Sequence, residues 1–402
     1  MTGIDFHRRR PAGADFLADN RVLLLENGTQ FFPALLAAIE SATHEIALET
    51  YIFAADATGL RIVAALAAAA RRGVAVRVLV DGFGARDFQQ GLNLGLALTA
   101  AGAEVEVYRA EAARLKLRRH RLRRLHRKLA VIDGRIAFVG GINIIDDDDA
   151  ILHGSRLDYA VEVSGPLAGV IHASMRHLWR LVGWAKLQRR PPSLPVSPLA
   201  GEAPAGTMAA AFLVRDNLRH RRDIEEAYLA AIAGARAEVL LASAYFLPGR
   251  RFRHALLAAA ARGVAVTIVL QGRVEYALQH YATQALYGNL LAGGVRIFEY
   301  HAGLLHAKVA VVDGGWATVG SSNIDPFSLL LAREANVVVQ DAGFAKELSA
   351  SLQRALDSGA SEVVLADLQR RSLPARILRW AAYGLVRLLL GITRYGGNDY
   401  RE

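Results

Sequence analysis

The sequence contains no cysteine, so disulfide bonds and thiolate chemistry contribute nothing to its stability or function. It also has no stretch of about 18 uninterrupted apolar residues, which argues against a transmembrane helix. Its first residues carry Arg8, Arg9 and Arg10 ahead of Pro11, and they lack the apolar core that a signal peptide requires. Together these absences predict neither a disulfide scaffold nor a membrane-spanning protein.

What the chain does contain is ample apolar material. Of its 402 residues 53% are hydrophobic, enough for two domains of ordinary size. Proline recurs between 189 and 204, which indicates a connector between those domains. The predicted organisation is a first domain over 1–190, a linker over 191–207, a second domain over 208–370 and a basic amphipathic segment over 371–402.

Two copies of one polar motif stand in the two halves of the chain. The first runs His-x-Lys-x4-Asp-Gly-x5-Gly-Gly-x-Asn from His126, and the second runs His-x-Lys-x4-Asp-Gly-x5-Gly-Ser-x-Asn from His306. They begin 180 residues apart and differ at one defined position, where Gly141 corresponds to Ser321. Chance does not readily produce such agreement. The sequence therefore predicts an internally duplicated protein that builds one site from both halves.

Apolar runs flank the Asp-Gly pair of each motif, a pattern that predicts a β-hairpin with a tight turn. With a two-residue loop, Lys128 would pair with Val139 and His126 with Gly141, and the second copy would follow the same count. The return strand would then bring Asn143 beside His126. The open end of each hairpin is thus predicted to carry the functional side chains.

These side chains suit a phosphodiester. Histidine and lysine two positions apart on a strand face the same side, so each hairpin presents an imidazole and an ammonium together. One neutral histidine could attack phosphorus and one protonated histidine could donate to the leaving alkoxide, because the ordinary histidine pKa of about 6.5 permits both states. The lysines would neutralise charge on the phosphoryl oxygens, and Asn143, Ser321 and Asn323 are candidate phosphate donors. No metal or cofactor is predicted, since the protein supplies the cations.

Both motifs match the signature of the phospholipase D superfamily, and the chain resembles that superfamily on those residues. The resemblance implies that His126 is the nucleophile that forms a phosphohistidine intermediate. It implies that His306 is the acid that protonates the leaving group. Lys128 and Lys308 complete the implied catalytic set.

The resemblance also implies that a carboxylate after each motif orients a catalytic histidine. Asp158 and Glu334 stand in the matching places, each opening an alternating apolar strand. The motif aspartates Asp133 and Asp313 belong to the catalytic signature, although their position indicates that they shape the turn. Because Gly141 lacks the hydroxyl of its counterpart, the two half-sites are predicted to be unequal.

The duplication extends beyond the motifs. Residues 66–76 and 257–266 each show an alanine-rich helix that ends at a glycine and is followed by a buried strand. Alternating helices and strands indicate an α/β architecture with helices covering the sheet. With the resemblance, the predicted fold is two tandem phospholipase D-like α-β-α sandwich domains, related by internal duplication and sharing one active site.

The net charge of +10 is unevenly distributed. A basic run over 114–128 leads into the first motif and favours contact with an anionic substrate or membrane over a merely solvated face. The segment from Leu373 predicts a basic amphipathic helix, which either lies at a membrane interface or docks on the protein's own surface. The consecutive acids of 146–149 predict a solvated turn, because their spacing does not fit a cation-binding loop.

Within the superfamily the resemblance narrows to the bacterial cardiolipin synthases, closest to their B type, on stretches such as 48–53, 244–249 and 317–326. It implies transfer of a phosphatidyl group through histidine to an acceptor such as phosphatidylglycerol, which yields cardiolipin. The implied partners are anionic phospholipids and the cytoplasmic side of the bacterial inner membrane, contacted peripherally, with no nucleic acid and no obligate protein partner. A phospholipase D-type hydrolase or a nuclease would use the same residues and is the alternative, ahead of a non-catalytic membrane-binding protein.

Overall fold

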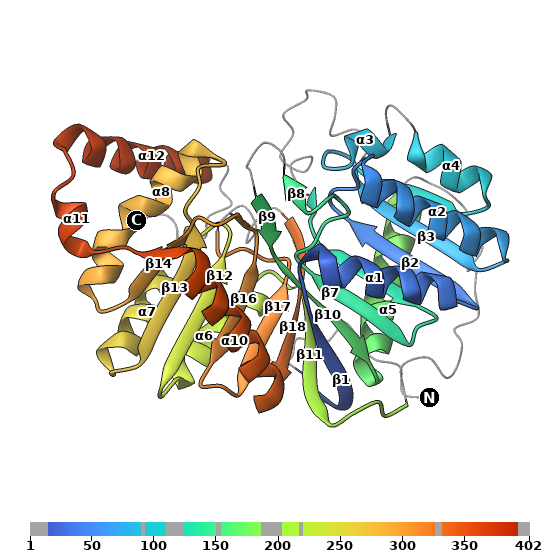
Figure 1. Cartoon of the computed structure of the whole chain (residues 1–402), viewed down its shortest axis with the longest axis horizontal. Coiled ribbons are helices and arrows are strands. Elements are labelled where there is room, and N and C mark those ends of the chain that lie inside the picture. Colours follow the sequence, from blue (N-terminus) through green and yellow to red (C-terminus); the bar gives the residue numbers. More distant parts are fainter. Residues whose placement is uncertain are drawn as a thin grey trace.

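The computed structural model describes residues 15–89, 93–109, 124–149, 154–185, 203–216, 220–325 and 332–392. Strands and helices alternate there in two similar series (Figure 1). The first series comprises β1 (Leu17–Glu26), α1 (Asn27–Ser41), β2 (Glu45–Thr50), α2 (Ala57–Arg71), β3 (Ala75–Asp81), α3 (Arg86–Gln89), α4 (Leu94–Ala100), β4 (Glu104–Tyr108), β5 (Arg124–Leu125), β6 (Lys128–Ile132), β7 (Ile136–Gly140), β8 (Asp148–Asp149), β9 (Gly154–Leu157), β10 (Tyr159–Ser164) and α5 (Pro166–Ala185).

The second series follows the same plan and adds helices at its end. It comprises β11 (Met208–Arg215), α6 (Asp223–Gly234), β12 (Glu238–Ser243), α7 (Arg250–Ala261), β13 (Ala265–Gln271), α8 (Ala277–Ala292), β14 (Arg296–Tyr300), β15 (Leu304–Leu305), β16 (Lys308–Val312), β17 (Trp316–Gly320), β18 (Ala332–Gln340), α10 (Ala342–Gly359), β19 (Ala360–Glu362), α11 (Leu365–Gln369) and α12 (Leu373–Ile392). The proline-rich connector lies mostly outside the described residues, so the predicted domain boundaries stay predictions.

Within the described residues, sixteen strands join into one continuous hydrogen-bonded sheet, and β15, β9 and β8 form a separate small sheet. The order of the large sheet is β19-β14-β13-β12-β16-β17-β18-β11-β1-β10-β7-β6-β2-β3-β4, with β5 attached to β18. The trios β12-β13-β14 and β2-β3-β4 are parallel, and each motif hairpin packs antiparallel beside its trio. Ligands of open α/β sheets bind outside the carboxyl ends of parallel strands, so those ends are where a site is expected.

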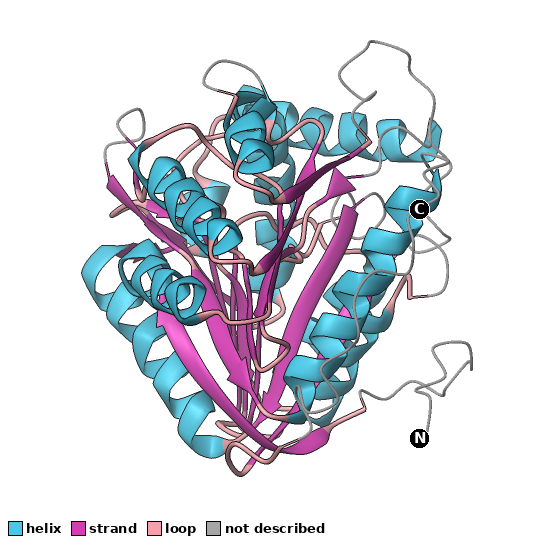
Figure 2. Ribbon diagram, turned by 90° about the vertical axis from the view of Figure 1, so that its right-hand side faces the viewer, coloured by secondary structure: helices cyan, strands magenta, loops and turns pink. Residues whose placement is uncertain are grey.

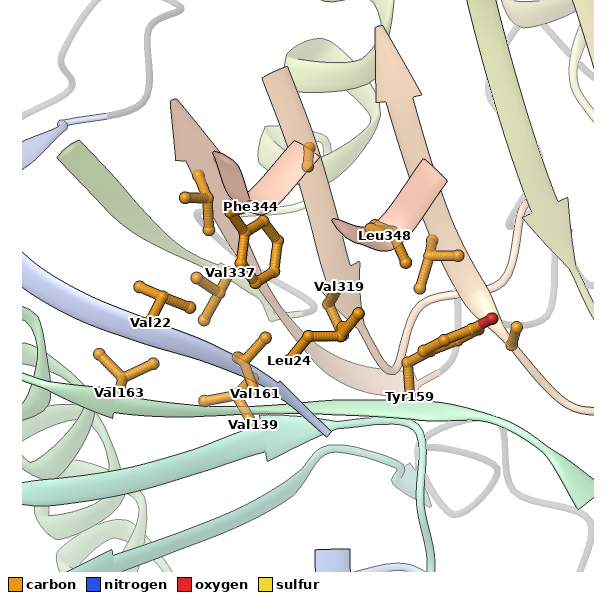
Figure 3. Packing of buried hydrophobic residues seen from close by; sticks show 14 of the residues in the cluster. Val22, Leu24, Val139, Tyr159, Val161, Val163, Val319, Val337, Phe344 and Leu348 are labelled. Carbon is orange, nitrogen blue, oxygen red and sulfur yellow. The ribbon is translucent and has the colours of Figure 1, made fainter. Parts of the chain in front are cut away.

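Helices cover the sheet on both faces, as Figure 2 shows. One core lies beneath α1, α2 and α4, and a second lies beneath α6, α7, α8 and α12. A third core is shared by the two halves. It brings Leu24 and Val161 of the first half against Val319, Val337 and Phe344 of the second (Figure 3). The predicted pair of α-β-α units related by duplication is therefore confirmed, and burial of the shared core holds the halves together.

The repeated helices begin and end for local reasons. The carboxylate of Asp56 accepts a hydrogen bond from the amide of Gly59 (2.8 Å) and so caps the start of α2. Alanine-rich turns follow, and the helix ends at Gly73, whose φ of +91° is costly for other residues. Gly263 ends α7 in the same way, with φ of +88°. Both helices and the strands after them lie where the sequence predicted them.

The motif hairpins form, but the predicted register is wrong by one residue. Lys128 pairs with Gly140, and Ile132 pairs with Ile136, so the loop holds three residues rather than two. Asp133 and Gly134 both have positive φ, 51° and 64°, and the residue after them leaves the ladder as well. The second hairpin shows the same register. An Asp-Gly pair is compatible with either loop length, and this is why spacing alone did not distinguish them.

The two motif aspartates anchor these turns. Each carboxylate accepts hydrogen bonds of 2.8 to 2.9 Å from three successive backbone amides at the start of a parallel strand: Thr43, His44 and Glu45 for Asp133, and Arg236, Ala237 and Glu238 for Asp313. The aspartates therefore lie at the far ends of β6 and β16 from the motif histidines. This geometry gives both aspartates a structural role in joining strands, at a distance from the histidines.

We expect Asp133→Ala to lower the free energy of unfolding by about 2–4 kcal/mol, because it orphans backbone donors and puts alanine at a positive φ. Turnover per folded molecule should stay within about threefold of the wild type, since the carboxylate is remote from the histidines. Urea denaturation and activity corrected for folded fraction would test this. Glu347→Ala, at an exposed position of α10, is the control. A stable but inactive Asp133→Ala protein would contradict the expectation.

The acidic run at 146–149 is not the solvated turn that was predicted. Oδ1 of Asp146 accepts a hydrogen bond from the amide of Thr58 (2.9 Å), and Oδ2 of Asp147 accepts one from the amide of Thr29 (3.1 Å). Both amides lie in the first turns of helices, where backbone donors have no partner within the helix. The prediction failed because these carboxylates satisfy helices that are distant in sequence.

The C-terminal amphipathic segment forms α12, which docks on α8 (Figure 1). Ala382 and Val386 are buried in the core of the second half, and Nε of Arg379 donates to Oε1 of Gln284 on α8 (2.7 Å). The opposite side of α12 leaves large apolar side chains exposed, Ile377 and Trp380 among them. The helix thus docks on the protein and still presents an apolar face. Within the described ranges, no helix combines the length and hydropathy needed to cross a bilayer.

Candidate active site

Two short strands bring the halves of the duplicated motif together. β5, which precedes the first motif histidine, pairs with β18 of the second half, and β15 pairs in the same way with β9 of the first half. The amide of His126 donates to the carbonyl of Arg333 (3.0 Å), and the amide of His306 donates to the carbonyl of Leu157 (2.9 Å). An acidic residue follows each of these carbonyls. Each histidine is therefore placed beside a carboxylate of the opposite half.

The side chains complete this crossed arrangement. Nδ1 of His126 lies 3.1 Å from Oε2 and 3.0 Å from Oε1 of Glu334, and Nδ1 of His306 lies 2.5 Å from Oδ2 of Asp158. The carboxylate side chains are 0% and 5% exposed, whereas both imidazoles are 17% exposed. A carboxylate at Nδ1 fixes the ring's tautomer and orientation. In both rings Nε2 is thus the nitrogen presented to a substrate.

The two motif lysines are buried between these pairs. Nζ of Lys128 donates to the backbone carbonyl of His126 (2.6 Å), and Nζ of Lys308 contacts the backbone carbonyl of His306 and lies 3.7 Å from Asp158. Burial lowers the pKa of Lys128 to about 7 and that of Lys308 to about 8, against the pull of the neighbouring carboxylates. Both lysines therefore lose a proton more easily than an exposed lysine does.

The histidines respond to the same environment. Burial lowers the pKa of His126, and burial together with the Lys308 ammonium lowers the pKa of His306, although a carboxylate faces each ring. The rings are therefore neutral in the unliganded protein at neutral pH. A phosphodiester carries one negative charge, and its arrival raises the pKa of every cation around it. Binding an anion is thus the event that can give one imidazole the proton a general acid needs.

The remaining polar residues of the motifs gather around the histidines and lysines. Oδ1 of Asn143 accepts from the amide of Ile52 (3.1 Å), and Oδ1 of Asn323 accepts from the amide of Tyr245 (3.4 Å). Among the described residues, no hydrogen bond engages the amide nitrogen of either asparagine, as a phosphate-binding role requires. Oγ of Ser321 instead donates to Oε2 of Glu334 (2.5 Å), so it supports the carboxylate that faces His126.

Gly141, where the two motif copies differ, is explained by the acid beside it. A Cβ atom built at Gly141 would lie 2.3 Å from Oδ1 of Asp158. The corresponding Ser321 faces Glu334, which has one more methylene and accepts the serine hydroxyl. Each half-site thus combines a carboxylate and a small residue that fit each other, and the predicted inequality of the half-sites has a steric cause.

We therefore expect Gly141→Ala to displace Asp158, to lower turnover by about tenfold or more, and to destabilise the protein by about 1–3 kcal/mol through overpacking. Gly183→Ala is the control, because a Cβ at that position of α5 would meet no atom within 4 Å. The measurements are steady-state turnover and chemical denaturation. Wild-type turnover by Gly141→Ala would show that the close approach has no consequence.

Tyr51 is a candidate site residue that the motifs did not reveal. Its ring centroid lies 4.9 Å from that of His126, and Nζ of Lys128 lies 5.4 Å from the centroid of Tyr51. Burial, reinforced by the charge of Asp81, raises the pKa of Tyr51 to about 12, so the phenol stays protonated. In the sequence, Tyr51 stood out only as a member of the 48–53 stretch. That stretch carries the family resemblance and belongs to a strand pattern that recurs in the second half.

Arg127, which belongs to the basic run predicted to meet an anionic partner, is buried and paired inside the protein. It is 3% exposed, and its guanidinium makes two hydrogen bonds to Glu49, with NH2 2.8 Å from Oε1. Ala307 and Ala242 occupy the corresponding positions in the second half, so this buried ion pair replaces an apolar pair. Residues 110–123, the greater part of the predicted run, lie outside the described residues.

The described residues contain no cluster of three or more histidine, aspartate or glutamate side chains that could hold a metal. The site instead offers two Nε2 atoms, two ammonium groups and two asparagine amides in one partly enclosed cluster. Such a set can bind a phosphoryl group, attack it and move a proton to the departing oxygen.

Comparison with known proteins connects this geometry to a family. Residues 35–179 and 228–356 match the family described as cardiolipin synthase, PLD-like domain. Cardiolipin synthase B of Escherichia coli strain K12 is 40% identical over 365 residues, covering 88% of this chain and 84% of that protein. Cardiolipin synthase A of Cronobacter sakazakii is 32% identical over 346 residues, covering 85% of this chain and 70% of that protein.

Solved structures share the fold at low identity. The phosphatidylserine synthase of Haemophilus influenzae Rd KW20 superposes with a TM-score of 0.68 at 13% identity, covering 96% of this chain and 98% of that one. Polyphosphate kinase of Porphyromonas gingivalis gives a TM-score of 0.58 at 16% identity, covering 94% of this chain and 54% of that one. At such identities the likeness concerns the fold alone.

Proposed function

The chain belongs to the cardiolipin synthase family of phospholipase D-like proteins, and we propose that it transfers a phosphatidyl group from one phospholipid to another to form cardiolipin. The observation that carries this proposal is the crossed cluster, in which two carboxylate-oriented histidines and two buried lysines meet. The proposed donor is phosphatidylglycerol, and the acceptor is the hydroxyl of a second phospholipid.

In the proposed first step, Nε2 of His126 attacks phosphorus while the bond from phosphorus to the head-group oxygen breaks. His306 gives its Nε2 proton to that oxygen, so a free alcohol leaves and a phosphatidyl group stays on His126. Lys128 and Lys308 neutralise the phosphoryl oxygens as charge builds on them. Asp158 and Glu334 hold the two rings in the tautomers that these roles demand.

In the second step, the incoming hydroxyl gives its proton to Nε2 of His306 and attacks phosphorus from the side that the first alcohol left. The phosphorus–nitrogen bond breaks and His126 returns to its neutral form. If water takes the place of the alcohol, the same sequence yields phosphatidic acid, so the hydrolase alternative shares every residue with the synthase. The two activities differ in the acceptor alone.

The test is to incubate the full chain with phosphatidylglycerol, labelled in its phosphatidyl group, in mixed micelles and to separate the lipids. We expect labelled cardiolipin together with free glycerol. Phosphatidic acid as the sole product would make the protein a hydrolase. Cleavage of a single-stranded oligonucleotide without lipid turnover would assign the same residues to a nuclease.

We further propose that the protein contacts the membrane peripherally through the apolar face of α12. Four large apolar side chains there are at least 59% exposed: Leu373, Ile377, Trp380 and Leu388. Arg376 on the same helix is exposed as well, which suits an anionic lipid surface. Figure 1 shows α12 and β9, the strand that leads into the site, both in the upper part of the molecule.

We expect Ile377→Glu/Trp380→Glu to weaken binding to vesicles that contain phosphatidylglycerol by about tenfold or more, because two apolar anchors become charged. Val364→Glu is the matched control: it is also exposed, but it precedes α11 near the amino end of β14. Vesicle sedimentation measures binding, and circular dichroism melting verifies the fold. Equal binding by the double variant and the wild type would rule out α12 as the contact.

A further inference from the structure

A polar pocket lies beside the catalytic cluster, in the second half of the chain. It opens at the carboxyl ends of β12 and β13, and its empty volume of about 360 Å³ includes the solvent at its open mouth. Its polar lining comes from Tyr245, Gln271, Arg273, Glu275, Gln279 and His280. Nothing in the proposed two-step chemistry uses these side chains.

The wall of the pocket is bonded to the backbone on both sides of His306. The amide of Ala244 donates to the carbonyl of Ala307 (2.9 Å), and the amide of Leu305 donates to Oε1 of Gln271 (3.1 Å). The charge of Glu275 is also among those that act on Lys308. A group held in this pocket would therefore lie on the His306 side of the phosphorus atom.

Gln271 shows that the pocket is built for a polar ligand. Its side chain is 7% exposed, and its carbonyl oxygen is occupied by Leu305. Its amide nitrogen has no hydrogen-bond partner among the described residues. A buried donor without a partner costs about 1–3 kcal/mol, which a ligand hydroxyl accepting that hydrogen bond would recover.

The balance of charge in the pocket favours an uncharged ligand. The guanidinium of Arg273 and the carboxylate of Glu275 both line it, so their formal charges offset each other. Burial lowers the pKa of His280, so that ring is neutral. Tyr245 donates its hydroxyl to Oε2 of Glu275 (2.6 Å), and this leaves acceptor capacity on the carboxylate. Donors and acceptors without net charge match the hydroxyl groups of a polyol.

The first half fills the corresponding place with its own residues. Asp81 replaces Gln271, and its two oxygens accept from the amides of Leu125, Phe83 and Gly84. A Cβ built at Gly84 would lie 2.5 Å from the backbone oxygen of Tyr51, so this loop packs closely against the residue whose ring contacts that of His126. Protein atoms therefore fill the space beside His126, whereas a pocket remains beside His306.

We propose that the pocket is the subsite for a glyceryl group, which enters as free glycerol or as the head group of phosphatidylglycerol. This assignment deepens the proposed transfer reaction and depends on it. Gln271 donates to one hydroxyl of the polyol and Glu275 accepts from another. The reacting hydroxyl then gives its proton to Nε2 of His306 as its oxygen bonds to phosphorus and the phosphorus–nitrogen bond to His126 breaks. In the reverse sense, the same subsite holds the glycerol that leaves the donor.

The test measures how the phosphatidyl enzyme divides between acceptors. The full chain is given phosphatidylglycerol labelled in its phosphatidyl group, with deuterated glycerol or ethanolamine in the water, and mass spectrometry counts four products. These are cardiolipin, glycerol-exchanged phosphatidylglycerol, phosphatidylethanolamine and phosphatidic acid. Ratios to phosphatidic acid do not depend on how fast the intermediate forms or on the fraction of folded protein.

We expect Glu275→Gln and Gln271→Met each to lower the ratio of glyceryl products to phosphatidic acid about tenfold, equivalent to about 1.4 kcal/mol. Glu347→Gln on the surface of α10 is the charge-matched control and should keep the wild-type ratio. A fall in glycerol exchange assigns the pocket to the free polyol, and a fall in cardiolipin assigns it to the lipid head group. Unchanged ratios in both variants, or an equal fall for ethanolamine, would overturn the subsite. Absence of all four products from the wild type would instead refute the proposed function.

Discussion

His126→Ala and His306→Ala are each expected to lower lipid turnover by about 10⁴-fold or more, because neither the nucleophile nor the proton donor has a substitute in the site. The two variants should fail at different steps. A phosphodiester with a nitrophenol leaving group needs no acid to depart. His306→Ala should therefore still form the phosphatidyl enzyme from such a substrate, whereas His126→Ala should form none.

Rapid quenching and mass spectrometry of the intact protein would detect the covalent adduct. With His306→Ala, we expect one phosphoryl adduct on His126 that hydrolyses slowly, since the base for the second step is missing. An adduct on His306 in the His126→Ala protein would reverse the two roles while keeping the mechanism. Substantial lipid turnover by both variants would rule out chemistry through two histidines.

The second large effect concerns the carboxylates. Asp158→Asn and Glu334→Gln are each expected to lower turnover by about 10³–10⁴-fold, the cost of losing the acid that fixes a catalytic imidazole. Because the pairs are crossed, the Glu334 variant should behave like His126→Ala and the Asp158 variant like His306→Ala. With the nitrophenyl substrate, Asp158→Asn should accumulate the adduct and Glu334→Gln should form little of it.

Glu226→Gln is the control for these variants, because it also removes a paired carboxylate, 2.7 Å from Arg251, outside the site. It should keep wild-type turnover. Adduct accumulation in Glu334→Gln rather than in Asp158→Asn would mean that each acid serves the histidine of its own half. The geometry of the pairs would then not describe the active enzyme.

Much of this arrangement could be predicted because it depends on residues that are close together in the sequence. The alanine-rich helices, the glycines at their ends and the alternation of the motif strands depend on neighbouring residues, and they lie where expected. The motif predicted His126, Lys128 and their counterparts as one cluster, and the structure brings them together. Asp158 and Glu334 were also placed beside histidines, as the resemblance implied. Their catalytic roles stay predictions.

The rest depends on contacts between distant segments. Which acid faces which histidine is decided by two-residue strands, β5 and β15, whose pairing with the other half leaves no pattern in the sequence. The hairpin register depends on whether Arg135 belongs to the loop or to the strand. The sequence is compatible with both, and the structure places Arg135 in the loop. The run at 146–149 was predicted to be solvated and Arg127 to face an anionic partner, because their actual partners lie 78 or more positions away in the sequence. Charge and polarity alone do not indicate where a side chain will find its partner.

The crossed carboxylates also indicate how the duplicated chain evolved. An ancestor with one copy of the motif could not have completed its own half-site, since the acid for each histidine comes from the other copy. It would have worked as a symmetric pair of identical chains, in which each contact across the twofold axis occurs twice. Joining the two copies in one chain released them from that identity. One copy could then keep aspartate beside glycine while the other kept glutamate beside serine, and a polyol pocket could arise on one side only.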